Sequence, residues 1–589
     1  MKQFFKFVAA SMLGFLISIF VIFIFFVIGI SAMIAAAGNE APADVSNNSV
    51  LRIDLNYPIN ERTISSPLEG LNIPGFKSTK SLGLNDILAS IKKARTDDNI
   101  KGICLDLSGI QAGMATIEEI RNALIDFKTS HKFIYSYSEV YTKGDYYLAS
   151  VADKVYINPE GFLEFSGFNS DITFFKGALD KLGIEAQIIK VGTYKSAVEP
   201  FILDHMSDAN RLQVTSFLGS MYDHYLLSIA ASRKIPKDSL FAIANELKVR
   251  TAVDAVKYRL ADGVRYKDQL LDELKAATGI DKKKNVNSIS IEDYSGNAGK
   301  TTAVTGDRVA VVYAVGEIAG GEGSDEVMGS EKISRDLRKV RLDDHVKAVV
   351  LRVNSPGGGV LASDVIWREV VLTRKVKPVV VSMGDVAASG GYYIACGADS
   401  IFAQPNTITG SIGVFGIIPN MKEFFNNKLG ITFDGVKTGQ YADMGSIDRP
   451  LTPAERLIFQ REVNRVYDGF TKRVAEGRKK SQAYVDSIGQ GRVWSGTEAL
   501  KIGLVDKLGS INDAIRSAAG MAKLKDYKLV NYPVMKDPFQ SLFDNSGERM
   551  KDYVTRMQLG EEYTYYKQLK SAVRLTGVQA RMPFTISVK

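Results

Sequence analysis

Hydrophobic residues form one long unbroken run near the N-terminus and only short runs farther along the chain. The long run is uncharged from Phe7 to Gly38, and about 20 apolar residues suffice to span a membrane. The apolar core of a cleavable signal is shorter, about 7–15 residues, although Ala35-Ala-Ala37 resembles a cleavage site. We therefore expect residues 7–38 to form a retained helix in contact with a lipid bilayer.

The charges beside this run predict its orientation. Lys2 and Lys6 precede the run, whereas Glu40 and Asp44 follow it, and lysine is enriched on the cytoplasmic side of membrane helices. We expect a single-pass protein of the inner (cytoplasmic) membrane with its N-terminus inside. The body of the protein is then expected on the extracytoplasmic, periplasmic side.

Beyond the anchor, short apolar runs typical of strands alternate with helical patterns, and the order of elements occurs twice. The two copies match at a constant offset of 246 residues, so that Asp97-Asp98 falls on Asp343-Asp344 and Tyr146-Tyr147 on Tyr392-Tyr393. Alternation of this kind is typical of α/β domains with a mostly parallel sheet. A period this long indicates a duplicated domain rather than a solenoid.

The repeat divides the chain into five predicted parts. We expect an anchor and spacer (1–45), a first α/β repeat (46–280), a linker (281–307), a second α/β repeat (308–525) and a C-terminal extension (526–589).

Composition narrows the class of protein only slightly. The net charge of +8 is spread along the chain, which is weak evidence for nearby anionic lipid and weaker evidence for nucleic acid. No nucleic-acid partner is predicted. The two cysteines, Cys104 and Cys396, both sit in apolar runs, where they are expected to be buried, and they cannot form a disulfide framework or a zinc site. We predict no metal site and no cofactor.

One short stretch has the features of a nucleophile-bearing turn. Residues 384–391 read Gly-Asp-Val-Ala-Ala-Ser-Gly-Gly, after an apolar strand pattern at 378–383 and before an apolar stretch that could open a helix. A serine between a strand and a helix N-terminus is well placed for attack, because small neighbours admit a substrate and helix N–H groups stabilise negative charge. Ser389 is the candidate nucleophile. A plain glycine-rich turn is the alternative.

The two copies differ at the positions that bear on catalysis. Ser389 matches Lys143 of the first copy, whereas Lys195 of the first copy matches Ala442 of the second. A neutral lysine can serve as the base for a serine if burial lowers its pKa, so a site completed across the two copies is the economical interpretation. Lys195 could instead be an exposed loop lysine. Lys143 could be a second functional lysine, but it is expected to be a solvated residue at a degenerate site.

Histidine is the usual base for a serine nucleophile, and the chain has four. His345 precedes the strand pattern 346–353 and is expected at the sheet end opposite the glycine-rich turn. The other three, His131, His205 and His224, lie in the first copy. A histidine base is therefore disfavoured.

Four motifs resemble those of a known family, the long, duplicated form of signal peptide peptidase A. They are Asn354-Ser-Pro-Gly-Gly-Gly359, Gly384-Asp-Val-Ala-Ala-Ser-Gly-Gly-Tyr-Tyr393, Thr409-Gly-Ser-Ile-Gly-Val414 and Gly192-Thr-Tyr-Lys-Ser-Ala-Val-Glu-Pro-Phe201. The resemblance implies a tandem crotonase-like or Clp-protease-like α/β fold and a membrane-anchored serine endopeptidase. It also implies a homotetramer that cleaves remnant signal peptides and other apolar peptides without a cofactor.

Roles for individual residues follow from the same resemblance. Ser389 would be the nucleophile, Lys195 the general base, and Ser411 the residue that orients the lysine. The backbone N–H of Gly390 and one from the loop containing Gly357 and Gly358 would form the oxyanion hole.

Two other functions remain open at this point. A crotonase-like acyl-CoA enzyme would use a similar glycine-rich oxyanion hole, but it has no need of a serine at position 389. A catalytically inactive membrane scaffold would explain the anchor and leave the serine as a relic.

Overall fold

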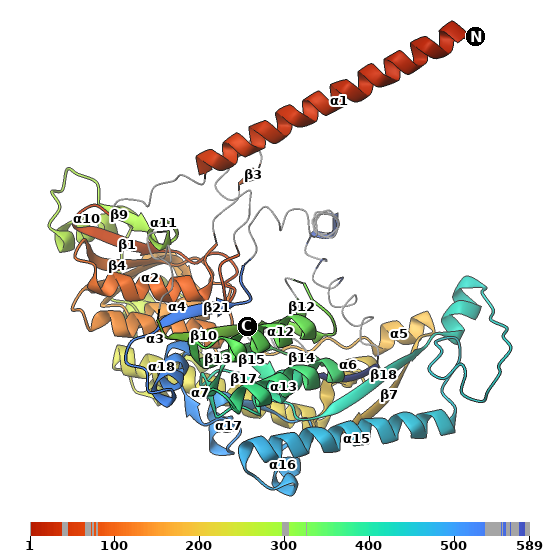
Figure 1. The fold of residues 1–589 in the computed structure, drawn as a ribbon. Helices are drawn as coiled ribbons and strands as arrows, with labels where there is room; N and C mark the ends of the chain where they lie inside the picture. The colour runs from red at the N-terminus through yellow and green to blue at the C-terminus, as the bar shows by residue number, and fades with distance from the viewer. Residues whose placement is uncertain are drawn as a thin grey trace.

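A computed structural model describes most of the chain (Figure 1). The described residues are 2–37, 45–64, 72–73, 76–77, 81–296, 306–324, 327–535, 555, 558–560, 563, 566 and 577–582. Part of the predicted spacer, residues 297–305 of the predicted linker and most of the predicted C-terminal extension lie outside the described residues.

The N-terminal apolar run forms a single helix, α1 (Lys2–Ala37), which projects away from the body of the molecule (Figure 1). Among the described residues, one stretch is long and apolar enough to cross a membrane, Lys6–Phe25, with a mean hydropathy of 2.7 and none of it buried within the protein. An isolated apolar helix exposed along its length is costly in water and stable in lipid. The helix therefore fits the predicted single-pass anchor.

The first repeat contains a parallel sheet covered by helices, as the alternating pattern predicts. Its strands lie in the order β8 (Gly263–Val264), β6 (Lys154–Leu163), β5 (Phe133–Tyr141), β4 (Ile100–Asp106), β1 (Ser49–Ile53) and β9 (Ser288–Ser290). Strand β9 falls within the predicted linker, so part of that segment packs as an edge strand of the first sheet. Helices α2 (Leu84–Thr96) and α3 (Met114–Lys128) pack against each other beside this sheet. Their buried leucines and isoleucines fall at helical spacing, which is why these segments form helices.

The second repeat builds a similar sheet, to which β21 (Lys528–Tyr532) of the predicted C-terminal extension adds an edge strand. Its strands lie in the order β19 (Val493–Ser495), β17 (Ile408–Gly410), β15 (Val379–Ala388), β13 (Val346–Ser355), β10 (Arg308–Val315) and β21, and β16 (Ser400–Ala403) pairs with β15. All pairs are parallel except β17 with β19. The central strands are almost wholly buried because helices cover both faces, and this explains their continuous apolar runs, which are rich in valine and alanine.

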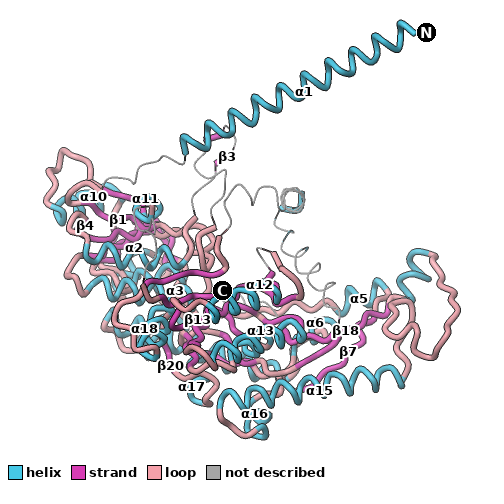
Figure 2. Tube along the Cα trace, viewed as in Figure 1, coloured by secondary structure: helices cyan, strands magenta, loops and turns pink. Residues whose placement is uncertain are grey.

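A third sheet combines strands from both repeats with one strand, β22 (Gly577–Arg581), from the predicted C-terminal extension. Its order is β12 (Val327–Gly329), β11 (Glu317–Ala319), β14 (Gly357–Gly359), β22, β18 (Val414–Asn420) and β7 (Glu185–Val191). Strand β7 belongs to the first repeat and pairs antiparallel with β18 of the second. Both strands run alongside the long helix α15 (Pro453–Arg478) (Figure 2). This pairing brings the segment that follows β7, including Lys195, to the second repeat.

The two repeats also share a buried ionic contact. Arg352 of β13 is fully buried and forms ion pairs with two carboxylates of the first repeat, Glu61 at 2.8 Å and Glu119 at 2.7 Å. Burial alone would lower the pKa of Arg352, but the two carboxylates outweigh it and raise that pKa. The guanidinium is therefore held in its charged form at the interface between the repeats.

A residue of the glycine-rich motif has a structural role at the same interface. The carboxylate of Asp385 accepts hydrogen bonds from the backbone N–H groups of Ala115 and Thr116, at 3.0 and 2.9 Å, in the first turn of α3. A carboxylate at a helix N-terminus satisfies N–H groups that have no partner within the helix. Asp385 thereby fixes the strand that ends at Ser389 against the first repeat.

Candidate active site

Ser389 lies at the turn between strand β15 and helix α14 (Gly390–Ala395), as the motif predicts. Its backbone has φ 55° and ψ −113°, a conformation that residues other than glycine rarely adopt. The turn is held by hydrogen bonds from the Ser389 N–H to the Gly410 carbonyl and from the Tyr393 N–H to the Ser389 carbonyl, both 2.8 Å long. The serine hydroxyl is thus fixed at the N-terminus of a helix.

Lys195 of the first repeat reaches this serine. Its Nζ lies 3.0 Å from Ser389 Oγ, 3.0 Å from Ser411 Oγ and 3.3 Å from the Ser411 carbonyl oxygen. All three residues are completely buried. The structure therefore brings together the three side chains that the sequence comparison singled out from separate motifs.

The electrostatic environment of Lys195 disfavours a positive charge. Burial lowers the pKa of Lys195 well below its usual value. Among the residues that the structure describes, none forms an ion pair with this lysine, and the ring of Phe415 lies 5.8 Å from its Nζ. A lysine in such surroundings can be neutral near physiological pH and can accept a proton.

The predicted oxyanion-hole glycines lie against the serine turn. Gly357 has φ +99°, and a Cβ added to it would lie 2.7 Å from the backbone nitrogen of Gly390. Only glycine allows this approach. Gly358 follows in β14. Gly357, Gly358 and Gly390 therefore lie beside the N-terminus of α14, where N–H groups can stabilise a negative charge.

A buried glutamine that the sequence did not single out positions the lysine loop. The Nε2 of Gln213 donates to the carbonyl of Tyr194 at 3.1 Å and to Ser196 Oγ at 2.7 Å. Its Oε1 accepts from the backbone N–H of Val493 in the second repeat at 3.1 Å. Gln213 lies on the long helix α7 (Asp208–Arg233), and its position within a helical pattern gave no signal of this role.

Gly491 makes room for the lysine, and substituting it should disturb the site. It has φ +80°, and a Cβ added to it would lie 2.6 Å from both Cα and Cβ of Lys195. We expect Gly491→Ala to lower kcat/KM for peptide cleavage by roughly 10²-fold, because displacing a reacting group by about 1 Å has such an effect. For wild type and variant, kcat/KM is measured together with the thermal unfolding temperature, so that a loss of activity can be separated from a loss of folding. Gly520→Ala, at a position with open space around it, is the control, and equal rates for all three proteins would contradict the prediction.

Other sequence candidates lie away from this site. His345 precedes β13 at the end of the strand opposite Gly357, as predicted, and His224 contacts Glu118 at 3.2 Å. The prediction that Lys143 is solvated was wrong. Its side chain is 12% exposed and ion-paired with Glu164, because the helix that begins at Lys143 packs into the first repeat.

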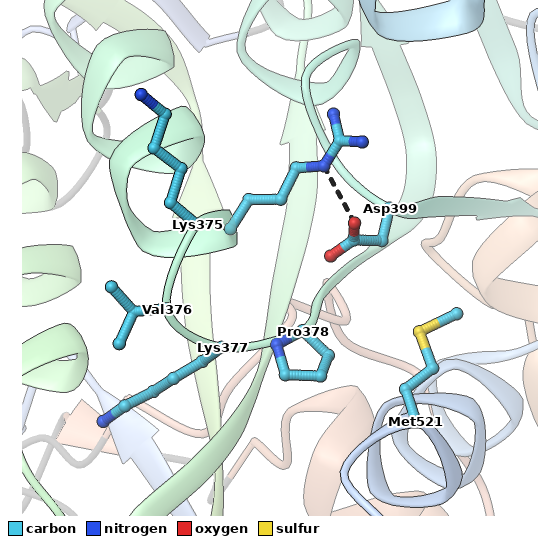
Figure 3. Close-up of a pocket in the computed structure, with 7 residues that line it drawn as sticks. Lys375, Val376, Lys377, Pro378, Asp399 and Met521 are labelled. Atoms are coloured by element: carbon cyan, nitrogen blue, oxygen red, sulfur yellow. Dashed lines mark hydrogen bonds and ion pairs between the residues drawn. The ribbon is translucent and has the colours of Figure 1, made fainter.

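Figure 3 shows a surface pocket of about 450 Å³ around Pro378. Pro378 precedes the first residue of β15, whereas Ser389 follows its last, so the pocket lies at the other end of the strand from Ser389. Residues 374–378, Asp399 and Met521 line the pocket. Within it, the Nε of Arg374 donates a hydrogen bond to Oδ1 of Asp399 at 2.8 Å. The pocket therefore has no contact with the buried serine and lysine.

Comparison with known proteins identifies the family. The family model for peptidase family S49 matches twice, over residues 126–281 and 372–525. The chain is 41% identical to Protease 4 of Salmonella typhi, over 76% of this chain and 74% of that protein. It is 31% identical to the chloroplastic serine protease SPPA of Arabidopsis thaliana, over 91% of this chain and 78% of that protein. A putative signal peptide peptidase SppA of Enterococcus faecium is 37% identical over 36% of this chain and 61% of that protein.

The double match agrees with the duplication read from the sequence, and the predicted tandem α/β fold and family resemblance are confirmed. The match over most of the length of two proteases excludes a chance likeness of short motifs. This chain therefore belongs to peptidase family S49 and is a serine peptidase.

Proposed function

We propose that Ser389 and Lys195 form the catalytic dyad of this peptidase and that it cleaves apolar peptides, including signal peptides left in the membrane. The observation that supports the dyad is the 3.0 Å distance between Lys195 Nζ and Ser389 Oγ. Both residues are completely buried. Hydrogen-bond contact between a nucleophile and a base is the first geometric requirement for nucleophilic catalysis.

In the first step, neutral Lys195 takes the proton of the Ser389 hydroxyl while Oγ attacks the carbonyl carbon of the substrate. The protonated lysine then donates this proton to the departing amine, and an acyl-enzyme ester remains on Ser389. Water attacks the ester, again with Lys195 as the base, and releases the free acid. Ser411 contacts the lysine amine at 3.0 Å and orients it toward the nucleophile throughout.

The negative charge that develops on the substrate oxygen needs fixed donors. The N–H of Gly390 and one from the Gly357–Gly358 loop supply them, because the two segments lie next to each other. Loss of one such donor typically lowers kcat by about 10²–10³-fold.

The substrate class rests on the anchor and on the relatives. Helix α1 would hold the protein at the membrane, with the N-terminus in the cytoplasm and the body outside, where apolar peptides collect in the lipid. A relative is named as a putative signal peptide peptidase. We extend the proposal to a homotetramer of the inner membrane, as the family resemblance implies, and light scattering of the detergent-solubilised protein would measure its mass.

Active-site labelling tests the dyad directly. The full chain in detergent micelles is treated with a fluorophosphonate, which reacts with activated serines. We expect about one label per chain, mapped to Ser389 by mass spectrometry of peptides, and no label on Ser389→Ala. The labelling rate should fall with acid as Lys195 becomes protonated. A label on another serine, or labelling that persists in Ser389→Ala, would overturn the assignment.

A further inference from the structure

A segment of this chain lies in the groove beside the proposed dyad. Strand β22 (Gly577–Arg581) pairs antiparallel with β14, which contains the oxyanion-hole glycines, and antiparallel with β18 on its other side. In register, Gly358 lies opposite Ala580 and Phe415 lies opposite Gln579. Insertion of an extended segment between two strand edges is a general way for proteins to bind peptides.

The register places the carbonyl of Ala580 beside the proposed oxyanion-hole segments. A Cβ added to Gly357 would lie 2.2 Å from the carbonyl oxygen of Ala580 and 2.7 Å from the nitrogen of Gly390. A Cβ added to Gly390 would lie 3.0 Å from that same oxygen. The Ala580 carbonyl oxygen therefore lies against both segments that are proposed to form the oxyanion hole. If a substrate lay in this register, the bond that corresponds to Ala580–Arg581 would be the scissile bond.

The side chains around this bond alternate in their surroundings, as expected of a strand. Ala580 is 1% exposed and Met582 is 5% exposed, whereas Arg581 between them is partly exposed. The Met582 N–H donates to the Pro356 carbonyl at 2.7 Å and continues the pairing past the bond. The groove thus encloses a small residue before the bond and leaves the residue after it at the surface.

The residue after the bond meets an acidic side chain. The Nη1 of Arg581 lies 3.0 Å from Oε1 of Glu317. Glu317 is on β11, which lies on the far side of β14 from β22. The two side chains are 20% and 36% exposed, so the pair is only partly screened by water. Glu317 is not part of the dyad or of the oxyanion hole, and it is available to contact any peptide that lies in the same register.

From this arrangement we propose that the groove between β14 and β18 binds substrates as an antiparallel strand and that Glu317 selects a basic residue immediately after the scissile bond. The residue before the bond is small, as Ala580 is. The proposal rests on the proposed function, because Ser389 Oγ forms the ester with the carbonyl of the small residue. The amine of the basic residue leaves with the proton from Lys195, and water then hydrolyses the ester.

A matched pair of peptides tests the selectivity. Both are internally quenched decapeptides with the same flanks; one contains Val-Gln-Ala-Arg-Met and the other Val-Gln-Ala-Glu-Met at its centre. With the full chain in detergent, we expect kcat/KM to be about two- to fivefold higher for the arginine peptide, within the range for an exposed ion pair. Mass spectrometry should find the cut after alanine. Strand β22 competes with both peptides alike, so the ratio of their rates is unaffected by it.

Charge reversal at Glu317 supplies the decisive comparison. In Glu317→Lys the ratio should invert, so that the glutamate peptide is cleaved faster, whereas Glu331→Lys, an exposed change in the first turn of α12 (Ser330–Leu342), should leave the ratio unchanged. A ratio near one in the wild type, or one that Glu317→Lys leaves unchanged, would overturn the proposal. If the peptides resist cleavage while fluorophosphonate still labels Ser389, this inference fails alone. If Ser389 is not labelled, the proposed function fails too.

Discussion

Replacing Lys195 with methionine should lower kcat/KM for peptide cleavage by roughly 10⁴-fold or more while the protein stays folded. Methionine fills similar space but cannot accept the Ser389 proton, and loss of a member of such a catalytic unit has an effect of this size. The measurement is steady-state hydrolysis of a fluorogenic apolar peptide by the full chain in detergent micelles.

Two further variants show whether the residues act as a unit. Ser389→Ala combined with Lys195→Met should be no less active than Ser389→Ala alone, because groups in one dyad have non-additive effects. Lys195→Arg should also be inactive, because an arginine stays charged and cannot serve as a base. Retention of a tenth of wild-type activity by Lys195→Met would show that another group is the base.

The same substitution should change how stability depends on pH. The usual lysine pKa is about 10.4, and burial lowers the pKa of Lys195 in the folded protein. Between these two pKa values the unfolded chain binds a proton that the folded chain does not, so the free energy of unfolding rises with pH across that window. In Lys195→Met this contribution disappears. Urea unfolding at several pH values would detect the difference, and parallel curves for both proteins would contradict it.

Replacing Arg352 with methionine should lower the free energy of unfolding by about 3–5 kcal/mol. The substitution leaves Glu61 and Glu119 buried without their cation, and breaking a buried ion pair from one side has this cost. Because the two carboxylates belong to the first repeat and Arg352 to the second, we expect the contact between the repeats to loosen first. Urea denaturation followed by circular dichroism measures the loss.

An exposed ion pair provides the control for this experiment. On the surface of α15, Nη2 of Arg465 lies 2.5 Å from Oε1 of Glu462. The side chains of Arg465 and Glu462 are 71% and 44% exposed. Arg465→Met should therefore change the free energy of unfolding by less than about 1 kcal/mol. If Arg352→Met lowered the free energy of unfolding no more than Arg465→Met does, water would have to reach the carboxylates of Glu61 and Glu119.

Much of the fold and the centre of the site could be predicted from the sequence, because the two repeats can be compared with each other. The duplicated order of strands and helices follows from hydrophobic spacing, which depends on local geometry. Ser389 and Lys195 stand out because each is missing at the matching position of the other copy. Their meeting at 3.0 Å is the expected result of the cross-repeat site.

The rest depends on contacts between distant segments that leave no local pattern. Nothing in the sequence around Gln213 or Glu61 shows that either reaches the second repeat. Asp385 looks like a polar member of the catalytic motif, yet it binds the start of α3. The pairing of β22 with β14 joins segments more than two hundred residues apart. The partial burial of Lys143 follows from tertiary packing that the residues next to it in the sequence do not predict.

The composite third sheet has a consequence for the timing of activity. Lys195 and Ser389 are 194 residues apart and meet only after β7 has paired with β18. The segment around Gly491 that accommodates the lysine is made later still during synthesis. A partly made or partly folded chain therefore holds a charged, solvated lysine and an unactivated serine. On the proposed function, the chain is therefore expected to be inactive until both repeats have docked, so that a protein still being made would not cleave its surroundings.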